Sequence, residues 1–326
     1  MKSFFIRAFL IGAGLFAATS NVALAQNNII SIIVPQPAGN PTDGVARKLQ
    51  PLLQKELGQT VVVENIPGAG GSIGVQKVLS GPADGSQIVI VSQTEPILTP
   101  FTLKGVKYKP EELRPVGLVS RLPYILTARP NLPARSLGEL VAFAKKQPAG
   151  MVTFGHIGPG SMIHLLGEQW GRKNGLSLNY VGYKGVPPVV QDLMGDQIDL
   201  TFLPLGGNTL ALLESGKVKA IGTTAAMPST KLQQVPSISA SDKKLSDFVY
   251  GTWIALLVPA KTPAAAVERL NKAITNAMKD ADLQIYITST GMEPAASNTL
   301  TDLNKFYATD TRLYQGLART IGVTPD

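Results

Sequence analysis

Residues 29–57 read IISIIVPQPAGNPTDGVARKLQPLLQKEL and set a pattern that the rest of the chain repeats. The first part, 29–34, is almost wholly apolar, as expected of a strand buried in a parallel sheet. A loop rich in proline and glycine follows, and a helix is then predicted over 43–57. Pro51 lies inside that helix, and we expect it to kink or shorten it, since an interior proline costs about 3 kcal/mol. The helix is predicted from apolar residues at helical spacing: Val45, Leu49, Leu52, Leu53 and Leu57.

The same alternation of strand, loop and helix continues to the C-terminus. Ser136 and Glu139 form a capping-box pattern ahead of one helix, and Thr262-Pro263 precedes another as cap and first helical residue. Trp253 lies in an apolar strand and is predicted to be a core residue. The alternation predicts an α/β fold of open sheets with helices on both faces. The further strands are predicted at 61–63, 87–91, 151–154, 178–181, 198–203, 219–224 and 252–258.

The first 25 residues have the parts of a secretory signal peptide. Lys2 and Arg7 supply positive charge, residues 8–18 are apolar, and Ala23 and Ala25 are the small residues that precede cleavage. The apolar run is much shorter than the roughly 20 residues that span a bilayer, which argues against a membrane anchor. We therefore expect residues 1–25 to be cleaved and the mature chain to be a soluble protein of the periplasm.

Composition limits the partners of the mature chain. Removing Lys2 and Arg7 leaves 28 basic residues against 22 acidic ones, a net charge of +6. The basic residues are scattered and aromatic residues are few, so we expect no nucleic-acid partner. A modest positive charge does suit an anionic ligand. The chain contains no cysteine, which excludes disulfides and a lipid-modified cysteine after the leader.

The loop at 35–43 follows a strand and precedes a helix, which is where ligands bind in open α/β sheets. The free amides and the dipole of the helix favour an anion at such a place. The small residues Ala38 and Gly39 allow the backbone to approach a carboxylate. The alternative is a rigid turn capped by Thr42 or Asp43, and both interpretations can hold together. The predicted ligand-binding residues of this loop are Gln36, Ala38, Gly39, Asn40, Thr42 and Asp43.

Residues 68–74, GAGGSIG, resemble a nucleotide-binding loop but fail its pattern. The pattern G-x-G-x-x-G requires glycine at 73, where this chain has Ile73, and no Gly-Lys-Ser/Thr follows. A tight turn with close helix packing is the favoured interpretation.

The third loop, GHIGPGS at 155–161, again places small residues at a predicted helix start. Gly155, His156, Ser161 and His164 are predicted to bind the ligand. Ser161 and His164 also allow a hydrolase, although the nucleophile elbow G-x-S-x-G is not present. No metal site is expected, because the chain has only two histidines, no cysteine and no H-E-x-x-H motif.

Together the motifs match a known family at the proper separations. The chain resembles the extracytoplasmic solute receptors of tripartite tricarboxylate transporters, the TctC-like or Bug family, over nearly all of its mature length. The matching segments are VPQPAGNPTDGVAR (34–47), LGQTVVVENIPGAGGSIG (57–74), FGHIGPGSMIHL (154–165), YKGVPPVVQDLMGDQID (183–199) and WIALLVPAKTP (253–263).

The resemblance implies a type II periplasmic-binding-protein fold, with two α/β lobes and a ligand cleft between them. The lobes are expected to comprise 26–125 plus 228–326 and 126–227. A small carboxylate is the implied ligand, held by loops 35–43 and 155–161, with Thr94 and Asp199 also facing the cleft. The implied partners are two membrane subunits of a tripartite tricarboxylate transporter. The protein is expected to be a monomer without a cofactor.

The chain departs from the family pattern within these loops. The family usually has an aromatic residue at Gln36, glycine at Asn40 and serine at His156, and often aspartate at Leu203. We hypothesise that Gln36, Asn40 and His156 supply side-chain donors to a second polar group of the ligand.

The favoured function is a binding receptor, not an enzyme, that closes on a small organic anion and delivers it to a transporter. Two alternatives remain: an exported hydrolase that uses Ser161 and His164, and a ligand sensor that works without a transporter.

Overall fold

The computed structural model describes residues 29–206, 208–227, 232–295 and 299–322. The predicted leader, 1–25, lies outside the described residues. Within those residues, no helix is long and apolar enough to cross a membrane.

The strands form one ten-stranded mixed sheet in the order β2-β1-β3-β9-β4-β7-β5-β6, with β8 and β10 paired to β4. The pairs β1–β2, β1–β3, β5–β6 and β5–β7 are parallel, whereas β9 and β4 run antiparallel to their neighbours. The strands are β1 Ile29–Val34, β2 Thr60–Asn65, β3 Gln87–Val91, β4 Leu113–Ala128, β5 Thr153–His156, β6 Asn179–Gly182, β7 Leu200–Pro204, β8 Lys219–Thr223, β9 Gly251–Pro259 and β10 Glu293–Pro294.

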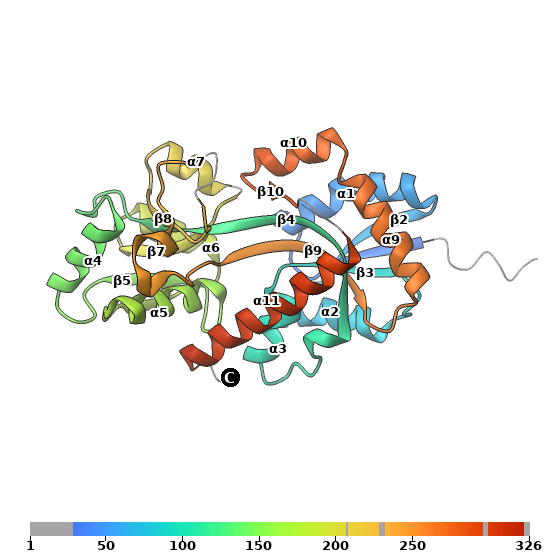
Figure 1. The fold of residues 1–326 in the computed structure, drawn as a ribbon, viewed down its shortest axis with the longest axis horizontal. Coiled ribbons are helices and arrows are strands. Elements are labelled where there is room, and N and C mark those ends of the chain that lie inside the picture. Colours follow the sequence, from blue (N-terminus) through green and yellow to red (C-terminus); the bar gives the residue numbers. More distant parts are fainter. Residues whose placement is uncertain (1–28, 207, 228–231, 296–298, 323–326) are drawn as a thin grey trace, which may run out of the picture.

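The helices cover both sides of this sheet (Figure 1). They are α1 Pro41–Leu57, α2 Ser72–Ser80, α3 Thr99–Thr102, α4 Leu137–Lys146, α5 Met162–Asn174, α6 Val186–Met194, α7 Asn208–Glu214, α8 Ile238–Ser241, α9 Ala264–Ala277, α10 Ala281–Ser289 and α11 Leu300–Ile321. Short helical turns occur at η1 Ala69–Gly71, η2 Thr94–Leu98, η3 Pro110–Glu112 and η4 Lys243–Leu245.

Alternate residues of β1 enter two different cores. Ile30, Ile32 and Val34 join a cluster with residues of α1, α9 and α10, whereas Ile33 joins a cluster with residues of α2, α5 and α11. Because successive strand residues point to opposite faces, both faces of β1 are buried under helices. This confirms the prediction of an α/β sheet covered on both sides.

The long strands β4 and β9 lie side by side across the middle of the molecule and join its two ends (Figure 1). The sequence analysis does not anticipate β4. Pro115 and Pro123 interrupt its pattern, because proline cannot donate to a sheet and rarely lies inside a strand. In the structure the register against β9 shifts between Pro115 and Gly117 and between Leu118 and Ser120, whereas Pro123 pairs in register with Gly251.

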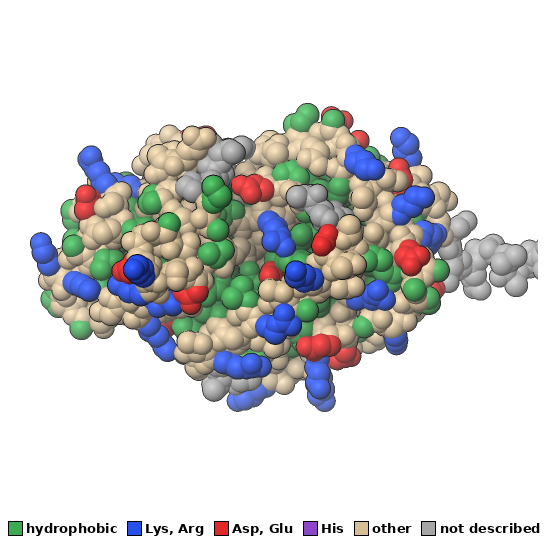
Figure 2. All heavy atoms as spheres, in the orientation of Figure 1, with side chains coloured by type: hydrophobic (Ala, Val, Ile, Leu, Met, Phe, Trp, Pro, Cys, Tyr) green, Lys and Arg blue, Asp and Glu red, His purple; other side chains and the backbone are tan. Residues whose placement is uncertain are grey.

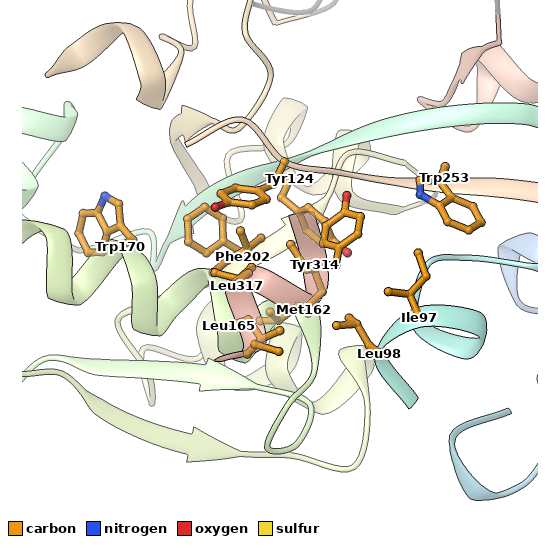
Figure 3. Packing of buried hydrophobic residues seen from close by; sticks show 14 of the residues in the cluster. Ile97, Leu98, Tyr124, Met162, Leu165, Trp170, Phe202, Trp253, Tyr314 and Leu317 are labelled. Carbon is orange, nitrogen blue, oxygen red and sulfur yellow. The ribbon is translucent and has the colours of Figure 1, made fainter. Parts of the chain in front are cut away.

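Helix α11 packs along the middle of the molecule and contacts both η2 and α5. Figure 3 shows Tyr314 and Leu317 of this helix in one cluster with Leu98 of η2 and Met162 of α5. Trp253 is only 2% exposed, which confirms that it belongs to the core.

Three details of the helix predictions are wrong. Helix α1 begins at Pro41, before the predicted residue 43, and its N-cap is Asn40 instead of Thr42 or Asp43. It also continues through Pro51 to Leu57, so the proline does not shorten it. Proline has no N–H, so the Arg47 carbonyl lacks its helical partner at Pro51. Both residues are exposed, which lets water reach that carbonyl. Pro263, in turn, is the N-cap of α9 and not its first residue.

Candidate ligand-binding site

The loops after β1, β2 and β3 meet at the carboxyl edge of these strands. The side-chain Nε2 of Gln36, after β1, donates to the carboxylate of Glu95, after β3. A β-carbon on Gly71, after β2, would lie 3.2 Å from the carbonyl oxygen of Pro35. Gly71 therefore permits a close approach of two loops, and the prediction that 68–74 forms a tight, closely packed turn is confirmed.

Asp43 fixes the shape of the first loop. Its carboxylate accepts hydrogen bonds from the Gly39 amide at 2.9 Å, from Arg47 Nε at 3.1 Å and from Asn65 Nδ2 at 3.0 Å. Burial opposes the charge, but these donors outweigh burial and lower the pKa of Asp43. The carboxylate is thus an internal anchor of the loop and stays ionised.

The polar side chains of the first loop use their donors within the protein. Asn40 caps α1 by accepting from the Asp43 amide at 3.0 Å and donates to the Pro37 carbonyl at 2.6 Å. Gln36 donates to Glu95. This geometry gives Gln36 and Asn40 a loop-shaping role beside the predicted recognition role. Within the described part of the chain, no hydrogen bond occupies the amides of Ala38 and Thr42.

Glu95 was missed by the sequence analysis, although it follows Thr94 directly. It is 3% exposed and accepts from the Ser92 amide at 2.9 Å and the Ser92 hydroxyl at 2.8 Å. Burial raises its pKa above the ordinary value. A carboxyl group in the loop after a buried strand, directly before the apolar residues 96–98, is the signal that would have identified it.

Thr94 starts η2, and its amide donates to the Ser92 hydroxyl at 3.2 Å. Gln93 connects this segment to the two long strands, because it donates to the Tyr124 hydroxyl at 3.3 Å and accepts from the Thr252 hydroxyl at 2.8 Å. The loop after β3 is therefore joined both to the first loop and to β4 and β9.

The second group of predicted residues surrounds the loop between β5 and α5. Ser161 is the N-cap of α5, accepts from the His164 amide at 3.3 Å and donates to the Gly158 carbonyl at 2.7 Å. Gly155 is buried, and a β-carbon there would lie 2.4 Å from Ile198 Cδ1. Small residues and a capped helix start thus occur here as they do after β1.

His156 and His164 lie at the two ends of this loop in sequence, and their rings contact each other, with centroids 4.6 Å apart. Nδ1 of His156 accepts from the Gly158 amide at 3.1 Å, and Nδ1 of His164 accepts from the Gly160 amide at 3.2 Å. Burial lowers the pKa of both rings. Both imidazoles are therefore neutral acceptors.

This arrangement does not form the nucleophile–base pair of a hydrolase. The Ser161 hydroxyl donates to a carbonyl, and Nδ1 of His164 accepts from a backbone amide. Nε2 of His164 lies 3.9 Å from the Glu168 carboxylate instead. Because general-base activation needs a hydrogen bond between the hydroxyl and the ring, the described geometry gives the hydrolase no support.

Asp199 lies at the amino-terminal ends of β5 and β7, opposite to the carboxyl ends where the predicted loops lie. It immediately precedes β7, and its carboxylate accepts from Arg129 Nε at 2.7 Å and from the Thr153 amide at 2.9 Å. Thr153 is the first residue of β5, whereas the 155–161 loop begins where this strand ends. The structure therefore does not bring Asp199 to the loop between β5 and α5.

Apart from Asp199, the predicted residues thus fall into two groups, one on each half of the sheet. Among the described residues, no hydrogen bond or ion pair joins the loop after β1 to the loop after β5. Figure 2 shows basic and acidic side chains interspersed over one face of the molecule, without a basic patch on that face.

Comparisons with known proteins find the same fold and sequence pattern. A family model described as "Tripartite tricarboxylate transporter family receptor" matches residues 45–323. Protein BugT of Bordetella pertussis is 32% identical over 319 residues, which cover 95% of this chain and 96% of that protein. The solved structure of the periplasmic binding protein BugD is 31% identical with a TM-score of 0.76, covering 91% of this chain and 99% of that one.

Two similar structures contain carboxylates. MatC from Rhodopseudomonas palustris, with bound malate, is 25% identical with a TM-score of 0.75 and covers 89% of this chain and 98% of its own. A second R. palustris protein, solved with adipate, is 25% identical with a TM-score of 0.78, covering 91% of this chain and 98% of its own. The fold is therefore that of the periplasmic binding proteins.

Proposed function

The chain belongs to the receptor family of tripartite tricarboxylate transporters, a family of periplasmic solute-binding proteins, and from this premise we propose that it captures a small organic dicarboxylate. The observation that supports the proposal most strongly is the pair of helix N-termini, or helix starts, at α1 and α5. Each follows directly on a parallel strand, β1 or β5, through a loop of small residues. Helix starts of this kind attract carboxylates through free amides and the helix dipole.

We infer that the carboxylates bind at the backbone amides that no described residue uses. At α1 they are those of Ala38 and Thr42, and at α5 they are those of Met162 and Ile163. One carboxylate at each helix start requires a ligand with two carboxylates. The malate and adipate bound by two similar proteins support this ligand class.

Binding at two helix starts on opposite halves of the sheet implies closure around the ligand. We infer two lobes, 26–125 plus 228–326 and 126–227, that move about β4 and β9 as a hinge. The closed receptor then delivers the dicarboxylate to the membrane subunits of a tripartite tricarboxylate transporter. Export to the periplasm by the leader 1–25 is part of the proposal, and a mature chain beginning at Gln26 in the periplasmic fraction would support it.

A melting-temperature screen tests the proposed function. The mature chain is heated with malate, adipate, mono- and tricarboxylates, and with adipamide as an uncharged control of adipate's length. Ligand binding to the native state stabilises it by RT ln(1 + [L]/Kd), so a dicarboxylate is expected to raise the melting temperature in a concentration-dependent way. Adipamide is expected to have no effect. Failure of every carboxylate to shift the melting temperature would contradict the proposal.

A further inference from the structure

The chain contains only two histidines, and both border the same loop. His156 is the last residue of β5 and is 5% exposed, and His164 is the third residue of α5. Their rings lie 4.6 Å apart at an angle of 37°. The two histidines therefore flank residues 157–161, the loop that leads to the proposed carboxylate site at α5.

Each ring accepts a hydrogen bond from one backbone amide of that loop. Gly158 donates to Nδ1 of His156 at 3.1 Å, and Gly160 donates to Nδ1 of His164 at 3.2 Å. A ring nitrogen that accepts a hydrogen bond carries no proton, so both rings have their hydrogen on Nε2. The two glycines have φ values of +123° and +73°, backbone conformations that glycine adopts readily and that residues with a side chain rarely adopt.

The surroundings favour the neutral rings. Tyr180 of β6 lies edge-on to both, at centroid distances of 6.5 Å from His156 and 5.7 Å from His164. Glu168 is the acidic neighbour and lies 3.9 Å from Nε2 of His164, but Arg172 pairs with the same carboxylate at 3.1 Å. Burial lowers the pKa of both histidines, and for His164 the neighbouring His156 lowers it further.

We propose that His156 and His164 are positioning residues for the ligand: as neutral acceptors they set the shape of loop 157–161, and their protonation releases the loop and the bound dicarboxylate. This inference rests on the proposed function for the part that concerns the ligand. The contact between the rings and the loop stands on its own.

The physical reason is a change of polarity at Nδ1. A protonated imidazole has donors on both nitrogens, so Nδ1–H then faces the amide hydrogen of Gly158 or Gly160 and the hydrogen bond is lost. Two positive rings 4.6 Å apart also repel each other. Binding should therefore be constant in mildly alkaline solution and weaken as the pH falls through the lowered pKa values. A direct role of cationic histidines in holding the carboxylate predicts the opposite trend.

The first experiment needs no ligand. Nitrogen-15 NMR of the two histidines and of the Gly158 and Gly160 amides is recorded while the pH falls from about 8 to about 5. We expect the Nε2–H tautomer for both rings at the upper end, with both amide signals following the ring titrations. An Nδ1–H tautomer in either ring, or glycine amides that do not follow the titration, would overturn the inference.

The second experiment measures malate binding by calorimetry from about pH 8 to about pH 5.5. The wild-type chain is compared with the double variant His156→Asn/His164→Asn, whose side-chain oxygens can accept the same amides but do not titrate. Asp310→Asn serves as a control, because Asp310 has a pKa of about 6 and lies outside the loop.

We expect the dissociation constant of the wild type and of Asp310→Asn to rise with acidification, relative to the double variant, by about tenfold per pH unit for each histidine ring that becomes protonated. Equal pH profiles for the wild type and the double variant, or tighter binding in acid, would overturn the histidine inference. A wild-type chain that binds no malate at any pH would contradict the proposed ligand class, and the NMR titration would then decide the histidine inference alone.

Discussion

At the scale of single residues, Asp43 anchors the loop that leads into α1. The substitution Asp43→Asn removes the ion pair with Arg47, whose Nη2 lies 3.1 Å from the carboxylate, and disturbs the hydrogen bond from Gly39. We expect the free energy of unfolding to fall by about 1–3 kcal/mol, since a buried hydrogen-bonded group loses partners. Malate binding should weaken as well, because the loop at 36–40 is then no longer anchored by the Asp43 carboxylate. Urea denaturation and calorimetry measure the two effects.

The conservative change Glu111→Gln is a suitable control, because Glu111 is exposed. The pKa of Asp43 is lowered in the folded protein, so its stabilising contribution is present above the ordinary value of 3.8 and is lost as the pH falls through the lowered value. A variant with unchanged stability at neutral pH would show that Asp43 does not anchor the loop.

Residue roles were predictable only where they depend on local sequence. Asn40, Thr42 and Asp43 are all good helix caps, so spacing alone does not show that Asn40 is the one used. Asp199 pairs with Arg129, which is 70 residues away along the chain. Likewise, the bond between Gln36 and Glu95 depends on the loops of two different strands meeting in space.

At the scale of elements, two helical glycines give a matched pair of tests. A β-carbon on Gly74 of α2 would lie 2.8 Å from Pro35 Cβ and 2.9 Å from the Ile66 carbonyl oxygen, whereas one on Gly316 of α11 would meet nothing within 4 Å. We expect Gly74→Ala to destabilise the protein by about 1–3 kcal/mol through overpacking. Gly316→Ala should stabilise it by about 0.5–1 kcal/mol. Destabilisation of both by the same amount in thermal unfolding would contradict the close packing at Gly74.

Helix α11 carries a half-buried carboxyl group beside β9. Asp310 accepts from Trp253 Nε1 at 2.9 Å and lines a cavity of about 420 Å³. Burial raises its pKa from 3.8 to about 6, although Arg121 and the Trp253 bond oppose this shift. The folded protein thus binds an extra proton between these values, and its stability falls as the pH rises through that window.

Asp310→Asn should remove this dependence of stability on pH, while the side-chain oxygen of the asparagine still accepts the hydrogen bond from Trp253. At about pH 7.5 we expect the variant to be more stable than the wild type by about 1–3 kcal/mol, and at about pH 4 the advantage should disappear. Melting curves over this pH range measure the difference. An advantage that does not change with pH would show that the carboxyl group titrates normally.

The elements that follow a simple pattern were predicted well. Strand β1 is a short apolar run beside a strong turn signal, and its bounds match the prediction. Strand β4 was not predicted, because proline rarely lies inside a strand; the register against β9 shifts next to Pro115 and again between Leu118 and Ser120. Those shifts depend on the partner strand, so the local sequence does not reveal them.

At the scale of the whole molecule, β4 and β9 join two halves that each present one helix start. Gln93 connects the loop after β3 to both strands, through Tyr124 of β4 and Thr252 of β9. The predicted ligand contact at Thr94 of that loop would therefore be linked directly to the strands about which the halves are proposed to move. A dicarboxylate that engages both α1 and α5 would favour the closed arrangement.

Titration calorimetry of the mature wild-type chain tests the central claim most directly. The chain is titrated with malate, with adipate, and with adipamide, which has the length of adipate but no charge. The account predicts saturable binding of one dicarboxylate per chain, at least about tenfold tighter than any binding of adipamide, because charged acceptors form the stronger hydrogen bonds to the helix amides. No saturable binding of either dicarboxylate, or equal binding of adipate and adipamide, would contradict it.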